Sequence, residues 1–589
     1  MDKIAILDFG SQFAHLLANR IRRLGVYSEI IDADTKAVDL KDYKGIIISG
    51  SPASVNAPDS PKADPKIYEL GIPILGVCYG HQLTMKTLGG EVRKGSVGEY
   101  GLTKFTVQKN TGVLSKLEQK TYQVYASHFD SVGKLPEGFE ALGSTPDDQF
   151  SATANEERRI YTLQFHPEVT HTECGMQILE SFVEITGANR DWSIDKFIEL
   201  ELDSITKKVG DKKVFMLVSG GVDSSVAYVL LAKALGPERI YAMYVDTGFM
   251  RKNESEEIKK FLKTAGVTDL HVEYAAEEYF MALKNVYEPE QKRKIIGDKF
   301  LEIQRRVAQE LNLNPDEWLL GQGTIYPDTI ESGGTKNADK IKTHHNRVPE
   351  IEEMIRQGKI IEPIKELYKD EVRMVGRKLG LPDEMVDRHP FPGPGLAVRC
   401  LCAEVAESCS AEVEAEGYKT NVLPIQSVGV QGDERTYRHP AILEGDHDWE
   451  KLRKLSPQIT NKYSEINRVM FAASGPITSI SVTPSYLTEE RIATLQEADQ
   501  LVMDFIRETD KEGLVWQCPT VLLPISINAE GKESIVIRPV SSTEAMTANF
   551  TELPWDGVQR LAEKLMQLPN ISAVFYDITN KPPGTIEWE

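Results

Sequence analysis

The chain has 589 residues, 41% of them hydrophobic and 27% charged, and its formal net charge is −21. This composition is typical of a folded, water-soluble protein, and the length predicts three or four domains of roughly 100–200 residues each. The negative charge argues against a protein that coats nucleic acid or anionic membranes, because those surfaces need concentrated positive charge. It is compatible with a local basic pocket for a small phosphate ligand.

Neither a membrane span nor a secretion signal is expected. No apolar run approaches the roughly 20 residues of a transmembrane helix, and the first residues lack the basic and apolar regions of a signal peptide. The six cysteines are too sparse for a disulfide framework, which favours a reducing cytoplasm. Cys400 and Cys402 form a C-x-C pair without a second ligand cluster, so we interpret them as core thiols rather than a metal site.

The first part of the chain alternates short apolar strands with helices. Strands are predicted at residues 4–8, 45–49 and 73–77, and a helix at 13–24. Continuous apolar strands of this kind are buried on both faces of a parallel sheet. We therefore expect residues 1–190 to form an open parallel-sheet α/β domain.

A second open parallel-sheet α/β domain is expected at residues 191–398. A strand at 214–218 runs into S-G-G-V-D-S-S and a helix at 226–234, and the next strand spans 240–245. The Pro-rich stretch at 388–395 can be neither helix nor central strand, so it ends this domain.

The remainder of the chain contains an internal duplication. Residues 422–445 are echoed by 521–542, and in each copy a tryptophan, Trp449 or Trp555, begins a predicted helix that leads to a further strand. The pattern predicts two small α+β subdomains. We place them at residues 399–485 and 486–589.

The first candidate site centres on Cys78. Glycines two residues either side of it permit a strained strand-to-helix turn that exposes the side chain. The following helix N-terminus favours a thiolate and offers N–H groups to an oxyanion. His166 can serve as its base, and Glu168 can orient the imidazole. The alternative is a buried thiol and a core histidine with its hydrogen bonds satisfied.

The strings G-V-C-Y-G-H-Q and Q-F-H-P-E together resemble the class I glutamine amidotransferases, whose fold is flavodoxin-like. The resemblance implies that Cys78 attacks the glutamine amide and releases ammonia through a glutamyl thioester. It assigns acid–base catalysis to His166, orientation of that ring to Glu168, and oxyanion N–H groups to Gly50 and Tyr79. Residues 127–130 are similar to a further family segment, with Phe129 where Gly is commoner.

The second candidate site is the S-G-G-V-D-S-S turn. Its glycines let the backbone approach a phosphate, and the helix N-terminus favours the anion. Asp223 can hold Mg²⁺, and the pattern is not a Walker loop. The alternative is an ordinary tight turn. The candidate ATP-binding residues are Ser219, Gly220, Gly221, Val222, Asp223, Ser224, Ser225 and Val245.

The full string resembles the pyrophosphate loop of N-type ATP pyrophosphatases, which have an adenine-nucleotide α-hydrolase-like fold. Strings at 292–298, 321–328, 342–346, 388–395 and 581–589 extend the match across nearly the whole chain. Together they resemble the glutamine-hydrolysing GMP synthetases, in the longer form with a duplicated C-terminal subdomain. The resemblance implies contacts with xanthosine monophosphate (XMP) at Arg293, Asp433, Gln517, Lys581 and Glu587.

The resemblance also implies the reaction. ATP with Mg²⁺ adenylates the C2 oxygen of XMP, ammonia from the first domain displaces AMP, and the products are GMP, AMP and pyrophosphate. Ammonia must arrive before it is protonated, so closed docking of the two domains or a channel between them is expected. The duplication favours a monomer, with a homodimer as the alternative.

Two other functions are compatible with parts of the sequence. The chain could be an adenylating amidotransferase for a different acceptor, such as a carboxylate or a tRNA base. The strings at 388–395 and 581–589 and the lack of a basic surface argue against it. It could instead be a non-catalytic protein descended from the enzyme, but the presence of Cys78, His166, Glu168 and Asp223 argues against that.

Overall fold

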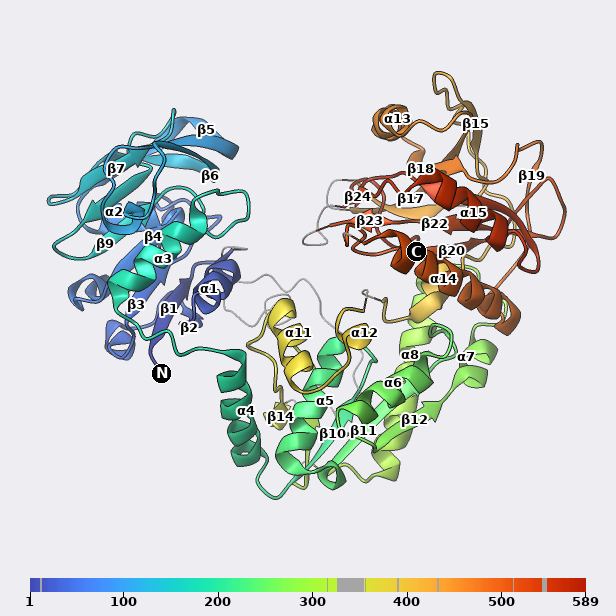
Figure 1. Ribbon diagram of the computed structural model, residues 1–589, viewed down its shortest axis with the longest axis horizontal. Helices are drawn as coiled ribbons and strands as arrows, with labels where there is room; N and C mark the ends of the chain where they lie inside the picture. The colour runs from blue at the N-terminus through green and yellow to red at the C-terminus, as the bar shows by residue number, and fades with distance from the viewer. Residues whose placement is uncertain are drawn as a thin grey trace. The chain divides into compact units, whose positions relative to one another are not determined.

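The computed structural model describes residues 1–10, 13–314, 316–325, 354, 356–388, 391–431, 434–511, 513–542 and 548–589. The chain divides into two compact units (Figure 1). The first consists mainly of Met1–Asp203 with Ile364–Val375, and the second mainly of Ser204–Gly323 with Gly376–Glu589.

The first unit is built on one mixed sheet with the strand order β2-β1-β3-β4-β9-β8-β7-β5-β6. Strands β2 to β9 in this order are parallel, and β8, β7, β5 and β6 continue the sheet as antiparallel neighbours. The elements are β1 (Lys3–Asp8), α1 (Ala14–Arg23), β2 (Tyr27–Asp32), β3 (Gly45–Ile48), β4 (Ile74–Val77), α2 (Tyr79–Thr87), β5 (Glu91–Val107), β6 (Thr121–Lys134), β7 (Glu140–Ser144), β8 (Ala152–Asn155), β9 (Ile160–Leu163) and α3 (Gly175–Thr186).

The apolar runs of the parallel strands follow from burial on both faces. In β1, Ile4 and Ile6 belong to one core cluster and Ala5 and Leu7 to another, because successive side chains point to opposite faces. Helix α1 covers the first face with residues at helical spacing, among them Leu17 and Ile21. The predicted strands and the predicted helix of this region are confirmed. The antiparallel half of the sheet is an addition that the apolar pattern did not indicate.

The second unit begins, after α4 (Ile194–Val209), with a parallel sheet in the order β12-β11-β10-β13-β14. From β10 the chain first adds β11 and β12 on one side and then returns to add β13 on the other. The strand order therefore reverses between β10 and β13, which is where open α/β sheets bind ligands. The elements of this unit are β10 (Lys213–Leu217), α5 (Val222–Leu235), β11 (Ile240–Asp246), α6 (Glu254–Thr264), β12 (Leu270–Tyr274), α7 (Ala276–Ala282), α8 (Pro289–Glu310), β13 (Trp318–Gly321), β14 (Ile360–Ile361) and α12 (Asp383–Val386). Helix α11 (Lys369–Lys378) belongs to the first unit as far as Val375 and to the second from Gly376.

The two C-terminal copies share one sheet, with the order β15-β17-β18-β25-β22-β20 and with β16 paired to β17. Each copy contributes an antiparallel pair followed by a parallel one, so the order of the second copy mirrors the first. The elements are β15 (Lys419–Val422), β16 (Ser427–Gln431), β17 (Glu434–Glu444), α13 (Trp449–Lys462), β18 (Ile466–Ala472), β19 (Ile480–Val482), α14 (Glu489–Thr509), β20 (Thr520–Leu523), β21 (Ile525–Ile527), β22 (Glu533–Ile537), β23 (Val540–Ser541), β24 (Asn549–Phe550), α15 (Trp555–Leu565) and β25 (Ile571–Asp577).

The seam between the copies is self-complementary. Strands β18 and β25 pair in antiparallel fashion, with Phe471 opposite Tyr576, each the sixth residue of its strand. Trp449 packs 5.3 Å from Tyr576, and Trp555 packs 5.1 Å from Phe471, measured between ring centroids. Equivalent residues therefore meet across a local two-fold axis, as in an isologous interface. The predicted duplication and its two tryptophan-led helices are confirmed.

The copies differ where they leave the shared sheet. In the first, β16 extends a long hairpin into β17, whereas the second copy ends in a tail after β25 that lies beside β16. The backbone N–H of Val428 donates to Trp588 O at 3.0 Å, and that of Val430 donates to Pro583 O at 2.7 Å. Within the described ranges, no helix is both long and apolar enough to cross a bilayer.

Candidate active sites

Cys78 lies at a sharp turn between β4 and α2. Its backbone has φ 53° and ψ −104°, a conformation that costs a residue with a side chain about 1–3 kcal/mol. A Cβ on Gly76 would lie 2.6 Å from Gly80 O, and one on Gly80 would lie 2.2 Å from Ile48 O. Both glycines are therefore required by close backbone contact, and the turn fixes the Cys78 side chain at the end of the strand.

His166 and Glu168 reach the same place from the neighbouring strand. Strand β9 pairs with β4 in parallel, so the residues that follow both strands meet at one sheet edge. His166 Nδ1 lies 2.7 Å from Glu168 Oε1, and both side chains are buried. Burial alone would lower the pKa of His166, but the charges of Glu168 and Cys78 outweigh it and raise that pKa well above its usual value. The arrangement favours a protonated His166 beside Cys78.

A cavity of about 930 Å³ opens above Cys78. Its wall includes Ser51, Cys78, Tyr79, Ser127 and His166. The backbone N–H of Gly80 donates to Ser49 O at 3.1 Å, so the segment after β3 packs against the start of α2. This contact brings Gly50, next to Ser51 in the chain, and Tyr79 to the same end of the sheet.

Residues 127–130 form another wall of this cavity. The Cys78 thiol donates to Ser127 O at 3.7 Å, and Gln82 Nε2 donates to Asp130 O at 2.8 Å. His128 Nε2 lies 3.1 Å from Glu99 Oε2, and its Nδ1 lies 3.1 Å from Asp130 O. Each ring nitrogen of His128 therefore faces an oxygen, and these two contacts fix the orientation of the ring.

The S-G-G-V-D-S-S segment joins β10 to α5. Helix α5 begins at Val222, four residues before the predicted start, because Gly221 takes an extended conformation as its N-cap. Gly220 has φ +80°, which suits glycine. Ser219 Oγ and Ser224 Oγ lie 3.1 Å apart, and Ser225 Oγ donates to Gly221 O at 2.9 Å. The hydroxyls gather at the helix N-terminus, where an anion is favoured.

Neighbouring strands complete this second site. A Cβ on Gly323, just after β13, would lie 2.7 Å from Ser224 Cα, so the segment touches the loop closely. Val245 is the last residue but one of β11 and lies toward the same edge of the parallel sheet. Phosphate-bound Mg²⁺ usually takes only one or two protein carboxylates. Asp223 supplies one in the first turn of α5, and the described residues contain no cluster of three or more His, Cys, Asp or Glu for a self-contained metal site. The residues therefore fit Mg²⁺ held jointly with phosphate.

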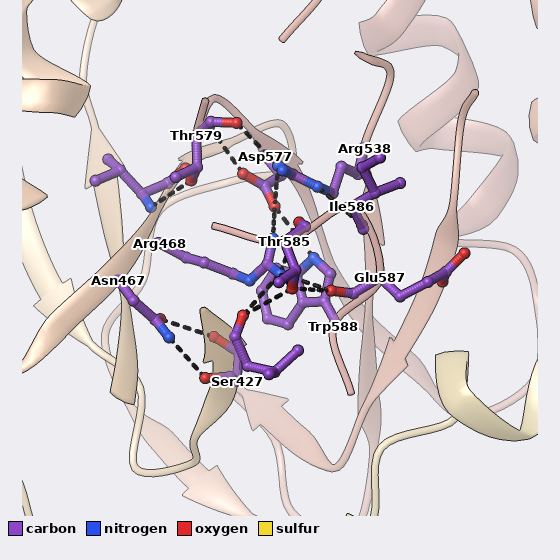
Figure 2. Close-up of polar contacts among 12 residues, drawn as sticks. Ser427, Asn467, Arg468, Arg538, Asp577, Thr579, Thr585, Ile586, Glu587 and Trp588 are labelled. Atoms are coloured by element: carbon purple, nitrogen blue, oxygen red, sulfur yellow. Dashed lines mark hydrogen bonds and ion pairs between the residues drawn. The ribbon is translucent and has the colours of Figure 1, made fainter. Parts of the chain in front are cut away.

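The end of the C-terminal tail is buried at Trp588 and Glu589, whereas residues 585–587 are half-buried. Asp577 accepts hydrogen bonds from Arg468 Nη1 and Trp588 Nε1, each at 3.1 Å, and forms an ion pair with Arg538 Nη1 at 2.8 Å (Figure 2). Burial alone would raise the pKa of Asp577, but the two guanidinium groups lower it. Arg468 Nη2 also donates to the backbone oxygens of Thr585 and Glu587, at 2.9 Å and 2.8 Å.

The last residue is held from α8. The carboxylate of Glu589 pairs with Lys292, which is fully buried and also donates to Cys400 O at 3.0 Å. Burial raises the pKa of Glu589, although Lys292 and Arg293 nearby favour its charged form. This contact places Arg293 beside the end of the tail.

Four of the five predicted XMP-binding residues lie in the described part of the chain. Gln517 Nε2 donates to Glu587 Oε1 at 3.4 Å, and Lys581 follows β25 and pairs with Ala548. Burial and the charge of Arg538 lower the pKa of Lys581. The structure thus brings Gln517 and Glu587 together and places Arg293 and Lys581 around the same tail. The other predicted positions, Asp433, 326–328, 342–346 and 389–390, lie outside the described residues.

Sequence reasoning missed the buried arginines that hold the tail. Arg399, Arg468 and Arg538 each have 0% relative exposure. Each sits within an apolar run, G-L-A-V-R-C, I-N-R-V-M-F-A or S-I-V-I-R-P-V. A lone arginine in such a run indicates a buried ion pair, because Arg is rarely buried without a partner.

Three family models match the chain. Residues 5–185 match the model described as glutamine amidotransferase class-I, residues 194–309 match NAD synthase, and residues 504–588 match the GMP synthase C terminal domain.

Curated relatives match over the full length. A probable glutamine-hydrolyzing GMP synthase of Leptospira interrogans is 46% identical and covers 100% of this chain and 99% of its own. Relatives named GMP synthase, glutamine-hydrolyzing, from Symbiobacterium thermophilum and Aquifex aeolicus are 39% and 37% identical, each over 100% of this chain and 99% of its own.

Proposed function

Because this chain belongs to the family of glutamine-hydrolysing GMP synthases, we propose that it makes GMP from XMP with ammonia released at Cys78. The observation that carries the proposal is the joint presence of two sites in one chain. One is a thiol on a strained turn beside a His–Glu pair, and the other is a hydroxyl-lined phosphate loop at a helix N-terminus.

In the glutaminase step, the Cys78 thiolate attacks the amide carbon of glutamine. The N–H groups of Gly50 and Tyr79 stabilise the oxygen that becomes negative. His166 then gives its proton to the leaving nitrogen, which departs as ammonia and leaves a glutamyl thioester. Water hydrolyses the thioester and restores the thiol. The raised pKa of His166 suits this role, since the ring must carry the proton at the start.

In the synthetase step, the 219–225 loop and Val245 bind ATP. The C2 oxygen of XMP attacks the α-phosphorus, pyrophosphate leaves, and the poor leaving oxygen becomes part of an adenylate. Ammonia adds to C2, and AMP departs with that oxygen to leave GMP. Mg²⁺, held by Asp223 together with phosphate oxygens, would neutralise charge on the departing pyrophosphate.

The substrate site is proposed around the tail. Arg293 and Lys581 suit the XMP phosphate, because both are cations at the C-terminal tail. Arg293 lies near Glu589, and Lys581 is partly buried near Arg538. Gln517, Glu587 and Asp433 suit ribose hydroxyls or base N–H groups. Burial, and then the charge of Arg538, lower the pKa of Lys581, and a bound phosphate would favour its charged form.

The wider assignments follow from the same reasoning. We assign residues 1–190 to ammonia release and 191–398 to ATP chemistry, with 399–485 and 486–589 as the substrate-binding pair. We propose a monomer, since the β18 edge of the first copy is already covered by β25 of the second copy within the same chain. Light scattering that gives twice the chain mass would reject this. All six cysteines carry free thiols, which supports a cytoplasmic location.

The direct test is synthesis by the purified chain. With XMP, ATP, Mg²⁺ and glutamine, we expect loss of the xanthine absorbance together with equal amounts of AMP and GMP. Ammonium chloride should replace glutamine. AMP formation with another acceptor, but not with XMP, would reject the proposal in favour of a different adenylating amidotransferase.

A further inference from the structure

Arg399 forms a bidentate ion pair with the carboxylate of Glu587 through two nitrogens of its guanidinium. Its Nε donates to Oε2 at 3.0 Å, and its Nη2 donates to Oε1 at 2.8 Å. The Arg399 side chain is fully buried, whereas that of Glu587 keeps 20% of its surface exposed. One side of the carboxylate is therefore fixed by protein, and the other side is accessible.

The rest of Arg399 is held from two further elements. It ends the short helix Gly395–Arg399, whose Leu396 N–H donates to Phe249 O at 2.7 Å. Asp499 on α14 lies 3.8 Å from Arg399 Nη1 and 3.4 Å from Arg251 Nε. The guanidinium groups of Arg251 and Arg399 lie 4.6 Å and 5.1 Å from the centroid of the Phe391 ring. These contacts leave the guanidinium little freedom to turn.

Stability alone does not explain a buried ion pair of this kind. Replacing such a pair by apolar residues of similar volume is often neutral or stabilising, because removing two charges from water is costly. A planar guanidinium does, however, fix a carboxylate in orientation as well as in position. A carboxylate has about four lone-pair sites, so the two bonds from Arg399 and the one from Gln517 Nε2 at 3.4 Å still leave an acceptor for a ligand.

We propose that Arg399 is a positioning residue for XMP recognition, acting through Glu587. It holds the carboxylate in a fixed orientation, and Asp499 with Arg251 holds Arg399. The inference rests on the proposed role of Glu587 as a contact to XMP. Arg399 itself contacts no substrate and takes no part in glutamine hydrolysis.

The test uses the full chain with ammonium chloride as the nitrogen donor, so that the thiol site does not limit the rate. KM for XMP, KM for ATP, kcat and the unfolding temperature are measured for wild type, Arg399→Lys, Glu587→Gln and the double variant. Arg399→Lys keeps the charge but loses the fork. We expect its KM for XMP to rise by up to about 100-fold, as for a displaced binding group, with KM for ATP unchanged.

The double variant decides how Arg399 acts. If it acts only through Glu587, the double variant is no worse than Glu587→Gln alone. The inference would be overturned if the rise in KM for XMP of the double variant were the product of the rises in the two single variants. It would also be overturned if Arg399→Lys raised KM for XMP and KM for ATP equally and lowered the unfolding temperature. Asp499→Asn should also raise KM for XMP. This variant replaces Arg399→Lys in the test if Arg399→Lys fails to fold.

A matched control separates the rise in KM for XMP from the general effect of replacing an arginine that pairs with carboxylates. Arg377 pairs with Asp383 at 2.9 Å and Asp387 at 2.6 Å on the surface, and Arg377→Lys should leave every constant unchanged. An unchanged KM for XMP in Glu587→Gln would reject the role of Glu587 and this inference with it, while synthesis by the wild type would still support the proposed function. Absence of GMP from the wild type would instead reject the function.

Discussion

Replacing Trp588 by alanine should abolish tight XMP binding while leaving glutamine hydrolysis intact. The side chain has 0% exposure, its Nε1 donates to Asp577, and its ring lies 4.8 Å from the Arg468 guanidinium. Truncating a buried Trp costs about 3–5 kcal/mol. Because the indole contacts Asp577 and Arg468, which hold the tail, the loss falls mainly on tail docking. At about 1.4 kcal/mol per factor of ten, docking weakens by roughly two to three and a half powers of ten.

The assay is ammonia-dependent GMP formation over a range of XMP concentrations, with glutaminase activity measured separately. Trp588→Phe is the graded comparison, since it keeps an aromatic ring but loses part of the buried indole and the bond to Asp577, the bond alone being worth about 1 kcal/mol. Deletion of residues 585–589 is the limiting case and should abolish synthesis. A Trp588→Ala protein with wild-type kcat and KM for XMP would refute the reasoning, because the tail would then bind substrate without its buried anchor.

Three further outcomes are expected. Cys78→Ala should lose glutamine-dependent synthesis but keep ammonia-dependent synthesis; loss of both would point to a structural role of the thiol. Glu168→Gln removes a charge that raises the pKa of His166, so the high-pH limb of glutamine hydrolysis should move to lower pH, and an unmoved limb would contradict the ion-pair geometry. Asp223→Asn should raise the Mg²⁺ concentration needed for adenylation about tenfold or more while glutamine hydrolysis is unchanged; an unchanged Mg²⁺ requirement would remove Asp223 from the metal.

Local patterns predicted the parts of the fold whose signal is contained in a short stretch. The strands at β1, β3 and β4 were readable because burial on both faces gives a continuous apolar run. The turn at Cys78 was readable because the chain needs glycine at 76 and 80, where a Cβ would meet backbone. The start of α13 at Trp449 was readable from the repeat itself.

Features that depend on distant partners were not readable. The antiparallel continuation of the first sheet depends on which hairpin pairs with β9. The ion pair between Arg399 and Glu587 joins residues that are 188 positions apart in the sequence, and no local pattern specifies that pairing. His128 was noted as part of a similar string, but its pairing with Glu99 emerged only from the register of β5 and β6. An arginine within an apolar run indicates a buried ion pair, but the run does not specify which distant carboxylate it meets.

The two-fold seam between β18 and β25 has a consequence for behaviour on dilution. When two separate chains form such a seam, its occupancy falls as the protein is diluted. Here both halves belong to one chain, so each meets the other at an effective concentration on the order of millimolar, set by the connecting residues. The specific activity of synthesis should therefore stay constant down to nanomolar enzyme. Because both copies lie in one chain, they can also differ in sequence, unlike the two identical subunits of a homodimer. One copy could therefore have a longer hairpin while the other has a tail.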